Sequence, residues 1–129
     1  MAEIEAWFDH AKAFMVVETG AGEIVGYAVA HPSADRCCYA GIGEFSVYVR
    51  RDRRGAGVGH AVMDALVDAA RTAGLWKLLS RIFPENRASL ALMARCGFKE
   101  IGVHEKHGKL DGVWRDCVIV ERLIPENLV

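Results

Sequence analysis

A glycine-rich turn lies between two segments for which the sequence predicts regular structure. Residues 44–49 are typical of a β-strand, and residues 60–73 have the apolar spacing of a helix. The turn has three glycines at alternate positions, Gly55, Gly57 and Gly59. Such a turn lets several backbone N–H groups converge on one point, where the start of the helix adds partial positive charge. This arrangement favours binding of a phosphate group; the alternative is a tight turn flanked by arginines that only face solvent.

Two common phosphate-binding motifs do not match this turn. A P-loop requires a lysine followed by serine or threonine directly after its glycines, and no such pair follows Gly59. A dinucleotide-binding fingerprint requires a third glycine at the position that His60 occupies. A nucleotide-binding module is therefore the weaker interpretation of the turn.

Composition sets the broad class of protein. The 129 residues are enough for one domain with a hydrophobic core, and residues 1–129 are treated as a single domain. The formal net charge of −1 does not indicate a nucleic-acid partner. No apolar run reaches the roughly 18 residues of a membrane span. The acidic N-terminus lacks the basic start of a signal peptide, so we expect a cytoplasmic protein without a membrane partner.

The cysteines and histidines do not form a recognisable metal-binding pattern. The four cysteines include no C-x-x-C pair, and we expect them to be reduced structural thiols: Cys37, Cys38, Cys96 and Cys117. His104, Glu105 and His107 are close in sequence, but their spacing matches no zinc site. We therefore expect no metal cofactor.

The apolar pattern predicts one sheet covered by helices. We expect helices over residues 2–13, 60–73 and 87–96, and strands over residues 14–18, 23–31, 44–50, 76–83, 98–105 and 114–123. A turn is expected over residues 108–112, and residues 39–43 are ambiguous. Strands 44–50 and 76–83 are joined by a crossover helix, so they should be parallel. Asn86 is a candidate N-cap. The fold class is therefore α/β (α+β), with a mixed sheet.

Five segments at matching spacing resemble the GCN5-related N-acetyltransferases, and within them the phosphinothricin N-acetyltransferase branch. Together they span nearly all of the chain from residue 14 to residue 123, and they are residues 22–27, 44–49, 54–59, 85–98 and 109–116. The resemblance implies a mostly antiparallel sheet with helices on both faces. It also implies that the central parallel strand pair is splayed apart to admit acetyl-CoA.

The resemblance implies a cofactor site at the splayed strands and the glycine turn. Backbone groups of residues 47–49 would bind the pantetheine arm, residues 54–60 would bind the pyrophosphate, and Asn86 would reach the arm through its amide. Val47 and Val49 could instead be plain core residues, and Asn86 could be only a helix cap. The complete set is Val47, Tyr48, Val49, Arg54, Gly55, Ala56, Gly57, Val58, Gly59, His60, Asn86 and Ser89.

The implied activity is acetyl transfer from acetyl-CoA to the amino group of a small molecule. The acceptor would be an amino acid or analogue of the phosphinothricin or methionine sulfoximine type. An amine must lose its proton before it attacks, and Glu44 resembles the family's glutamate at this strand position, so we expect it to be the general base. The alternative is an exposed carboxylate at a strand end. We expect direct attack rather than a Cys96 intermediate, because no histidine is expected near that thiol.

Two features depart from the family pattern. Met93 occupies a position where the family usually has histidine or tyrosine, which leaves Tyr48 as a weak candidate for the general acid. The chain also starts later than the family's usual first strand and helix. The resulting open sheet edge favours a homodimer, and members of the family are commonly homodimers. Trp114 and Asp116 would shape the acceptor end or the dimer contact, or form a buried tryptophan with a hydrogen-bonded aspartate. The alternative function is a non-catalytic acyl-CoA-binding or partner-binding domain.

Overall fold

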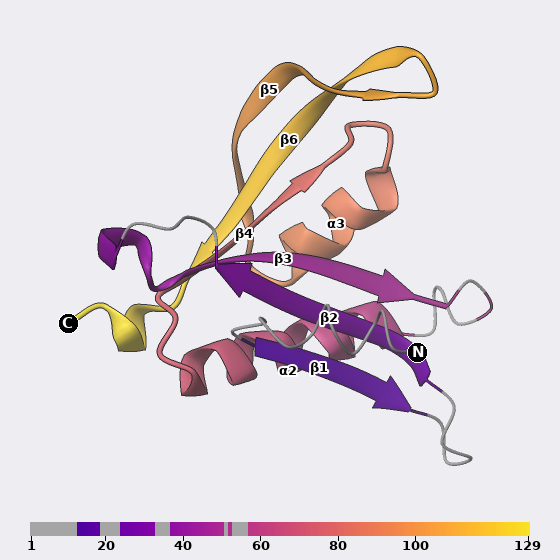
Figure 1. Cartoon of the computed structure of the whole chain (residues 1–129). Coiled ribbons are helices and arrows are strands. Elements are labelled where there is room, and N and C mark those ends of the chain that lie inside the picture. Colours follow the sequence, from indigo (N-terminus) through magenta and orange to yellow (C-terminus); the bar gives the residue numbers. More distant parts are fainter. Residues whose placement is uncertain (1–12, 19–23, 33–36, 51, 53–56) are drawn as a thin grey trace.

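One mixed sheet with two helices packed against it forms the described part of the chain (Figure 1). The structure is a computed structural model that describes residues 13–18, 24–32, 37–50, 52 and 57–129. The helices are α2 (Val58–Thr72) and α3 (Arg87–Arg95), with short 3₁₀ turns η1 (Cys37–Tyr39) and η3 (Pro125–Asn127). The strands are β1 (Ala13–Glu18), β2 (Ile24–Pro32), β3 (Ile42–Val49), β4 (Lys77–Ile82), β5 (Lys99–Leu110) and β6 (Val113–Leu123).

The sheet has the strand order β1-β2-β3-β4-β6-β5 among the described residues. Strand β3 runs parallel to β4, whereas the other neighbouring pairs are antiparallel. This confirms the predicted mixed sheet with one central parallel pair. The β3–β4 ladder ends at Glu44 and Leu79, and the two strands then diverge (Figure 1). Just beyond the last pair, the Ser80 hydroxyl donates a 2.8 Å hydrogen bond to the Phe45 carbonyl, which satisfies a backbone group that the ladder leaves unpaired.

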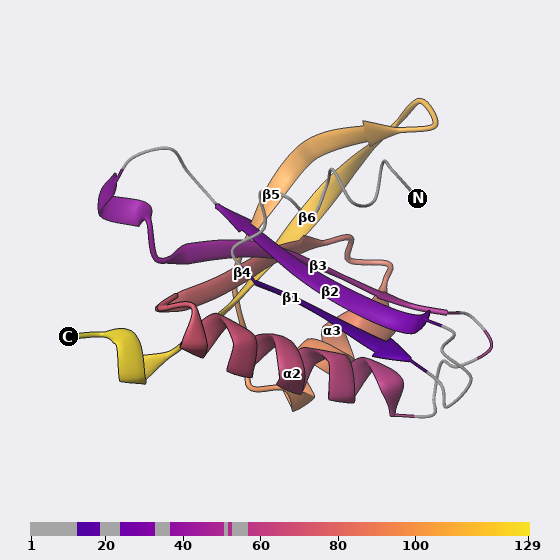
Figure 2. The same cartoon turned by 60° about the horizontal axis from the view of Figure 1, so that its bottom comes forward.

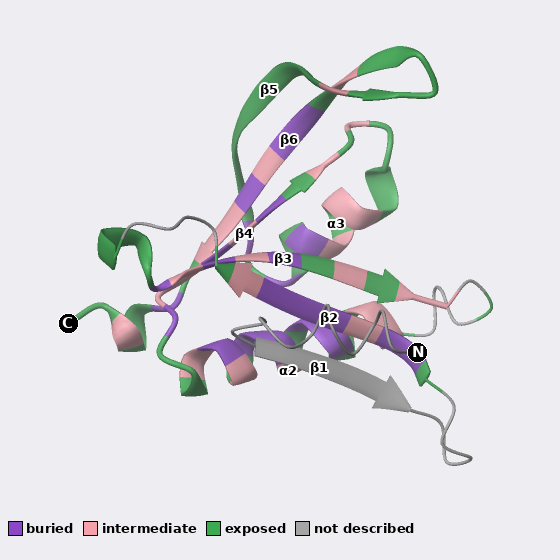
Figure 3. Ribbon diagram, viewed as in Figure 1, coloured by how far each residue is buried: buried purple, intermediate pink, exposed green. Residues whose placement is uncertain are grey.

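The core lies between the sheet and the two helices. Helix α2 contributes a buried apolar stripe: Val62, Met63, Leu66, Val67 and Ala70. This stripe forms one buried cluster with residues of β2, β3, β4 and β6 and with Met93 of α3. Both described helices therefore cover the same face of the sheet (Figure 2), and Figure 3 shows the buried residues concentrated along that contact. The helix expected over residues 2–13 lies outside the described residues except for Ala13, which begins β1.

Local capping signals fix where the two helices begin. Gly57 has a φ of 80°, the left-handed region that favours glycine, and α2 starts at the next residue, two positions earlier than predicted. Asn86 precedes α3, and its Oδ1 accepts a 3.2 Å hydrogen bond from the Ser89 N–H. The predicted N-cap is therefore confirmed, and α3 is followed by Gly97 with a φ of 85°.

The hairpin of β5 and β6 is longer than the sequence predicted. Residues 108–110 were expected in a turn, but they pair with residues 113–115 and extend β5. The turn consists of Asp111 and Gly112, which have φ values of 51° and 77°. Two successive positive φ values are typical of the tight two-residue hairpin turn. A glycine at the second position therefore allows the strands to pair to the tip.

Gly41 supports the start of the parallel strand pair. Its carbonyl accepts hydrogen bonds of 2.8 Å from the Trp76 N–H and 3.2 Å from the Lys77 N–H. A Cβ at Gly41 would overlap the Trp76 ring. We expect Gly41→Ala to lower the free energy of unfolding by about 3 kcal/mol, because overpacking forces the ring from its site. Thermal unfolding checks this, with Gly102→Ala as the control, since no atom lies within 4 Å of a Cβ at Gly102.

Candidate functional site

A cavity of about 500 Å³ opens where β3 leaves β4, and the starts of α2 and α3 form its other walls. It brings together predicted site residues from three separate segments of the chain: Val47, Tyr48, Val49, Gly57, Gly59, His60, Asn86 and Ser89. Its walls also include Ala88, Leu92 and Arg95, which were not predicted from the sequence. Of these, only Arg95 could have been suspected from the sequence, because it is a cation in the last turn of the helix that Asn86 caps.

The backbone of β3 alternates between the cavity and strand β2. The Phe45 carbonyl points away from β2, because it accepts the Ser80 hydroxyl of β4. The Arg50 N–H points toward β2, because it donates a 2.7 Å hydrogen bond to the Val25 carbonyl. Since successive residues of a strand alternate, the N–H and C=O groups of Val47 and Val49 face the gap beyond Ser80. These groups can pair with an amide-bearing ligand as a further strand would.

Tyr48 contributes to the cavity in a different way from its neighbours. The same alternation turns its backbone groups toward β2, where it is the register partner of Tyr27. The two rings stack with centroids 5.4 Å apart, on the sheet face opposite the helices. Tyr48 as a whole residue is 47% exposed. The expectation of a cofactor contact through the Tyr48 backbone therefore does not fit this strand, although Tyr48 is among the residues that line the cavity.

The start of α2 forms the second wall. The first N–H groups of a helix lack partners within the helix and carry partial positive charge, so this wall suits an anion. The Val58 side chain packs against the core and Gly26 rather than lining the cavity. His60 lines the cavity, and its Nδ1 lies 3.1 Å from Asp64 Oδ2. Three residues of the predicted pyrophosphate turn lie outside the described residues: Arg54, Gly55 and Ala56.

Glu44 lies at the point where the parallel strands separate. Its register partner on β4 is Leu79, the last pair of the ladder. The side chain is half-buried on the face opposite the helices, and its Oε1 lies 3.1 Å from Arg81 Nη1. Glu44 is not part of the cavity wall; it precedes Val47 on the same strand. The carboxylate and its arginine partner are therefore held beside the ladder end from which the gap opens.

Met93 and Cys96 occupy the inner side of α3. Met93 is 1% exposed and belongs to the core cluster, so the position at which the family usually has histidine or tyrosine fills the core here. Cys96 is 4% exposed, and burial raises the pKa of its thiol, with a smaller contribution from the nearby Asp64 carboxylate. The expectation that no histidine lies near Cys96 is wrong, because ligand atoms of His60, Asp64 and Cys96 all lie within 4.8 Å of one another.

The position of Cys96 nevertheless disfavours an acyl-cysteine step. Its thiol is not part of the cavity wall that Val47 and Val49 form. The raised pKa keeps the sulfur protonated at neutral pH, and the thiolate is the nucleophilic form. The expectation of a reaction without a Cys96 intermediate therefore stays a prediction.

Trp114 and Asp116 lie on the β5–β6 hairpin and outside the cavity wall. Trp114 is 58% exposed, with Lys109 Nζ 5.7 Å from its ring centroid, so the interpretation as a buried tryptophan is wrong. Asp116 Oδ1 accepts a 2.8 Å hydrogen bond from the Lys106 N–H, which confirms a hydrogen-bonded aspartate. Lys106 has a φ of 47°, so Asp116 stabilises a strained irregularity in β5.

Comparisons with known proteins give one matching family and several similar proteins. The acetyltransferase (GNAT) family matches residues 1–98. An L-methionine sulfoximine/L-methionine sulfone acetyltransferase of Pseudomonas paraeruginosa is 36% identical over 126 residues, which cover 94% of this chain and 73% of that protein. A phosphinothricin N-acetyltransferase of Streptomyces coelicolor is 34% identical over 100 residues, which cover 78% of this chain and 58% of that protein.

A solved structure has the same fold and holds a ligand. It is a phosphinothricin acetyltransferase from Sinorhizobium meliloti in complex with acetyl-CoA. The two structures superpose with a TM-score of 0.86 at 27% sequence identity, over 95% of this chain and 69% of that one.

Proposed function

The chain belongs to the acetyltransferase (GNAT) family, and from this premise we propose that it transfers the acetyl group of acetyl-CoA to the amino group of a small amino acid or analogue. The observation that carries the proposal is the cavity at the β3–β4 divergence, which joins an unpaired strand edge to the start of a helix. The strand edge suits the amides of a pantetheine arm, and the helix start suits a pyrophosphate.

The proposed cofactor placement assigns a role to each wall. Val47 and Val49 offer backbone groups to the pantetheine amides, and the α2 start with the glycine turn holds the pyrophosphate. Asn86 uses its Oδ1 for the helix cap, so its NH₂ group is the part that donates to the arm. Arg95, on the cavity wall, adds a positive charge that favours a ligand with phosphate groups.

The proposed reaction is direct attack by the neutral amine on the thioester. Glu44 accepts the amine proton, directly or through water, and Arg81 holds the carboxylate in place. A backbone N–H of the splayed strand β3 donates to the carbonyl oxygen as it gains charge. Met93 is buried and supplies no acid. A thiol has a pKa of about 8.5, so the CoA thiolate leaves without full protonation more easily than an alkoxide would.

The acceptor class follows from the relatives. One relative named for methionine sulfoximine and methionine sulfone matches 94% of this chain at 36% identity, and one named for phosphinothricin matches 78% at 34% identity. These compounds are amino acid analogues with an α-amino group and a polar group on the side chain. We therefore propose them as the first acceptors to supply.

Thermal unfolding with added ligands tests the cofactor assignment. Acetyl-CoA at about 100 times its Kd should stabilise the fold by about 2.7 kcal/mol, which shifts the Tm by several degrees. ATP and NAD are the controls, because both carry phosphates but lack a pantetheine arm. A shift with ATP or NAD and none with acetyl-CoA would instead support a nucleotide-binding module.

Asn86 allows the cap and the ligand role to be separated. Asn86→Ser keeps a side chain that caps helices well but has no amide, so the Tm should stay unchanged while the KM for acetyl-CoA rises about tenfold. Asn86→Ala should raise the KM similarly and also lower the free energy of unfolding by about 1 kcal/mol. Steady-state kinetics and thermal unfolding of both variants check this. A wild-type KM in Asn86→Ser would reduce Asn86 to a helix cap.

We also propose that the enzyme is a homodimer. The β5–β6 hairpin lies at the edge of the sheet and exposes apolar side chains: Ile101, Val103, Leu110, Val113 and Trp114. A second copy of the chain would remove this surface from water. Light scattering after size-exclusion chromatography should give twice the mass of one chain, and the mass of a single chain would contradict the proposal.

The proposed location is the cytoplasm. All four cysteines are free thiols, which suits a reducing compartment: Cys37, Cys38, Cys96 and Cys117. Among the described residues, no helix combines the length and the apolar character that crossing a membrane demands.

A further inference from the structure

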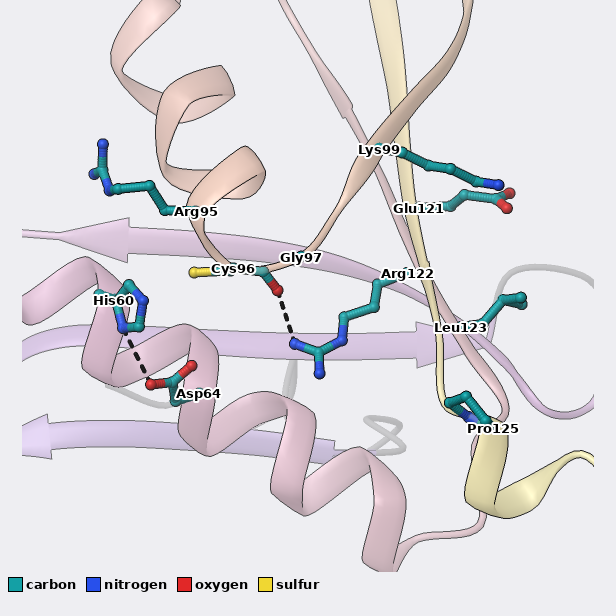
Figure 4. Close-up of a pocket in the computed structure, with 10 residues that line it drawn as sticks. All are labelled: His60, Asp64, Arg95, Cys96, Gly97, Lys99, Glu121, Arg122, Leu123 and Pro125. Carbon is teal, nitrogen blue, oxygen red and sulfur yellow. Dashed lines mark hydrogen bonds and ion pairs between the residues drawn. The ribbon is translucent and has the colours of Figure 1, made fainter.

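His60 and Asp64 of α2 and Cys96, which follows α3, converge on one point (Figure 4). His60 and Asp64 lie one turn apart on α2, so their side chains share a side of the helix, and Nδ1 lies 3.1 Å from Oδ2. Cys96 follows the last residue of α3, and Figure 4 shows its sulfur directed toward His60. One ligand atom from each residue lies within 4.8 Å of the other two.

The three atoms are an imidazole nitrogen, a carboxylate oxygen and a thiol sulfur, which are the ligand types of protein zinc sites. Tetrahedral zinc with bonds of about 2.0–2.3 Å holds its ligand atoms about 3.3–3.8 Å apart. The His60–Asp64 distance is already close to this range. Both of these side chains are exposed, so small rotations can bring them to the distance that the buried sulfur requires.

We propose that His60, Asp64 and Cys96 bind a divalent transition-metal ion of the zinc class. The cluster lines a second cavity, of about 540 Å³, whose lining residues are drawn in Figure 4. Three protein ligands leave the fourth position of tetrahedral zinc open, and this cavity has room for water or an exchangeable ligand there. No metal was expected from the sequence, because these ligands are far apart in the chain: two lie on α2 and the third follows α3.

The backbone around Cys96 is fixed before any metal binds. Arg122 Nη1 donates a 2.7 Å hydrogen bond to the Cys96 carbonyl, which holds the end of α3 in place (Figure 4). On binding, a zinc–sulfur bond replaces the S–H bond, and the proton passes to solvent. The positive charges of Arg95 and Arg122 favour the thiolate, and the metal itself supplies the larger attraction.

Titration of the metal-free protein with Co²⁺, which replaces zinc and reports on sulfur ligands by absorbance, tests the site. We expect one Co²⁺ per chain and a near-ultraviolet thiolate-to-cobalt band that Zn²⁺ abolishes by competition. Cys96→Ser should remove the band. His60→Gln and Asp64→Asn should each weaken Zn²⁺ binding by at least about tenfold. Mutation of residues that only hydrogen-bond to a metal ligand already lowers metal affinity by about that factor.

Matched controls distinguish this cluster from other metal-binding groups. Combined Cys37→Ser and Cys38→Ser should leave the band unchanged, because both of these thiols are exposed and absent from the cluster. His104→Gln should do the same, although its ring stacks on that of His107. The proposal is overturned if wild-type protein gives no thiolate band, or if His60→Gln and Asp64→Asn bind Zn²⁺ as tightly as wild type. No acetyl-CoA is present, so this result is independent of the acetyltransferase assignment.

Discussion

Glu44→Gln is expected to lower kcat about 1,000-fold while the KM for acetyl-CoA stays near its wild-type value. Removing a positioned general base typically costs 10²–10⁴ in rate, since the amine then attacks only in its rare neutral form. Glutamine has the size of glutamate and can still accept a hydrogen bond from Arg81, so the fold should be retained. The difference in kcat between Glu44→Gln and wild type should become smaller as the pH rises toward the pKa of the acceptor amine, because more of the amine is then neutral without a base.

Glu121→Gln is the matched control for this variant. Glu121 is also a strand carboxylate in an ion pair, with Oε1 3.4 Å from Lys77 Nζ, and it is not part of the cavity at the β3–β4 divergence. We expect wild-type kcat from this variant. If Glu44→Gln also turned over at the wild-type rate across the pH range, Glu44 would be a structural partner of Arg81 and no base.

Ser89→Trp is expected to weaken acetyl-CoA binding strongly without unfolding the protein. Ser89 lies in the first turn of α3 and lines the cavity, so an indole ring there would fill space that the proposed pantetheine arm needs. Its backbone N–H, which the Asn86 cap uses, is unaffected by the change of side chain. We expect the Kd for acetyl-CoA to rise at least 100-fold, about 2.7 kcal/mol, and the thermal shift to disappear.

Arg87→Trp adds the same ring to the same helical turn, but Arg87 is exposed and outside the cavity wall. This control should bind acetyl-CoA as wild type does. Calorimetry on both variants checks the difference. Equal affinities would show that the ligand lies elsewhere.

The features that the sequence predicted correctly depend on local patterns. The crossover between residues 44–50 and 76–83 implied the parallel pair, because such connections have few alternatives. Asn86 was identified as an N-cap from its residue type and position, and its side chain does cap α3. The convergence of the β3 edge, the α2 start and Asn86 followed from resemblance, and the shared cavity agrees with it.

Other features depend on packing between distant segments, which a single sequence does not reveal. The approach of Cys96 to His60 arises where the end of α3 meets the first turn of α2, and no spacing rule joins those positions. The backbone direction at Tyr48 depends on the register between β2 and β3. A shift of one residue in this register would turn every N–H and C=O group of β3 to the opposite side of the strand. The length of β5 depends on the positive φ values at Asp111 and Gly112, which allowed pairing beyond the expected turn.

The release of CoA on addition of an amine tests the central claim most directly. Protein is mixed with acetyl-CoA, and the free thiol is followed with and without L-methionine sulfoximine, methionine sulfone or phosphinothricin. We predict that CoA release depends on the amine, produces an equal amount of N-acetylated product, and is lost in Glu44→Gln. Binding of acetyl-CoA without release in the presence of these acceptors and a wider panel of amino acids would contradict the account and favour a non-catalytic acyl-CoA-binding domain.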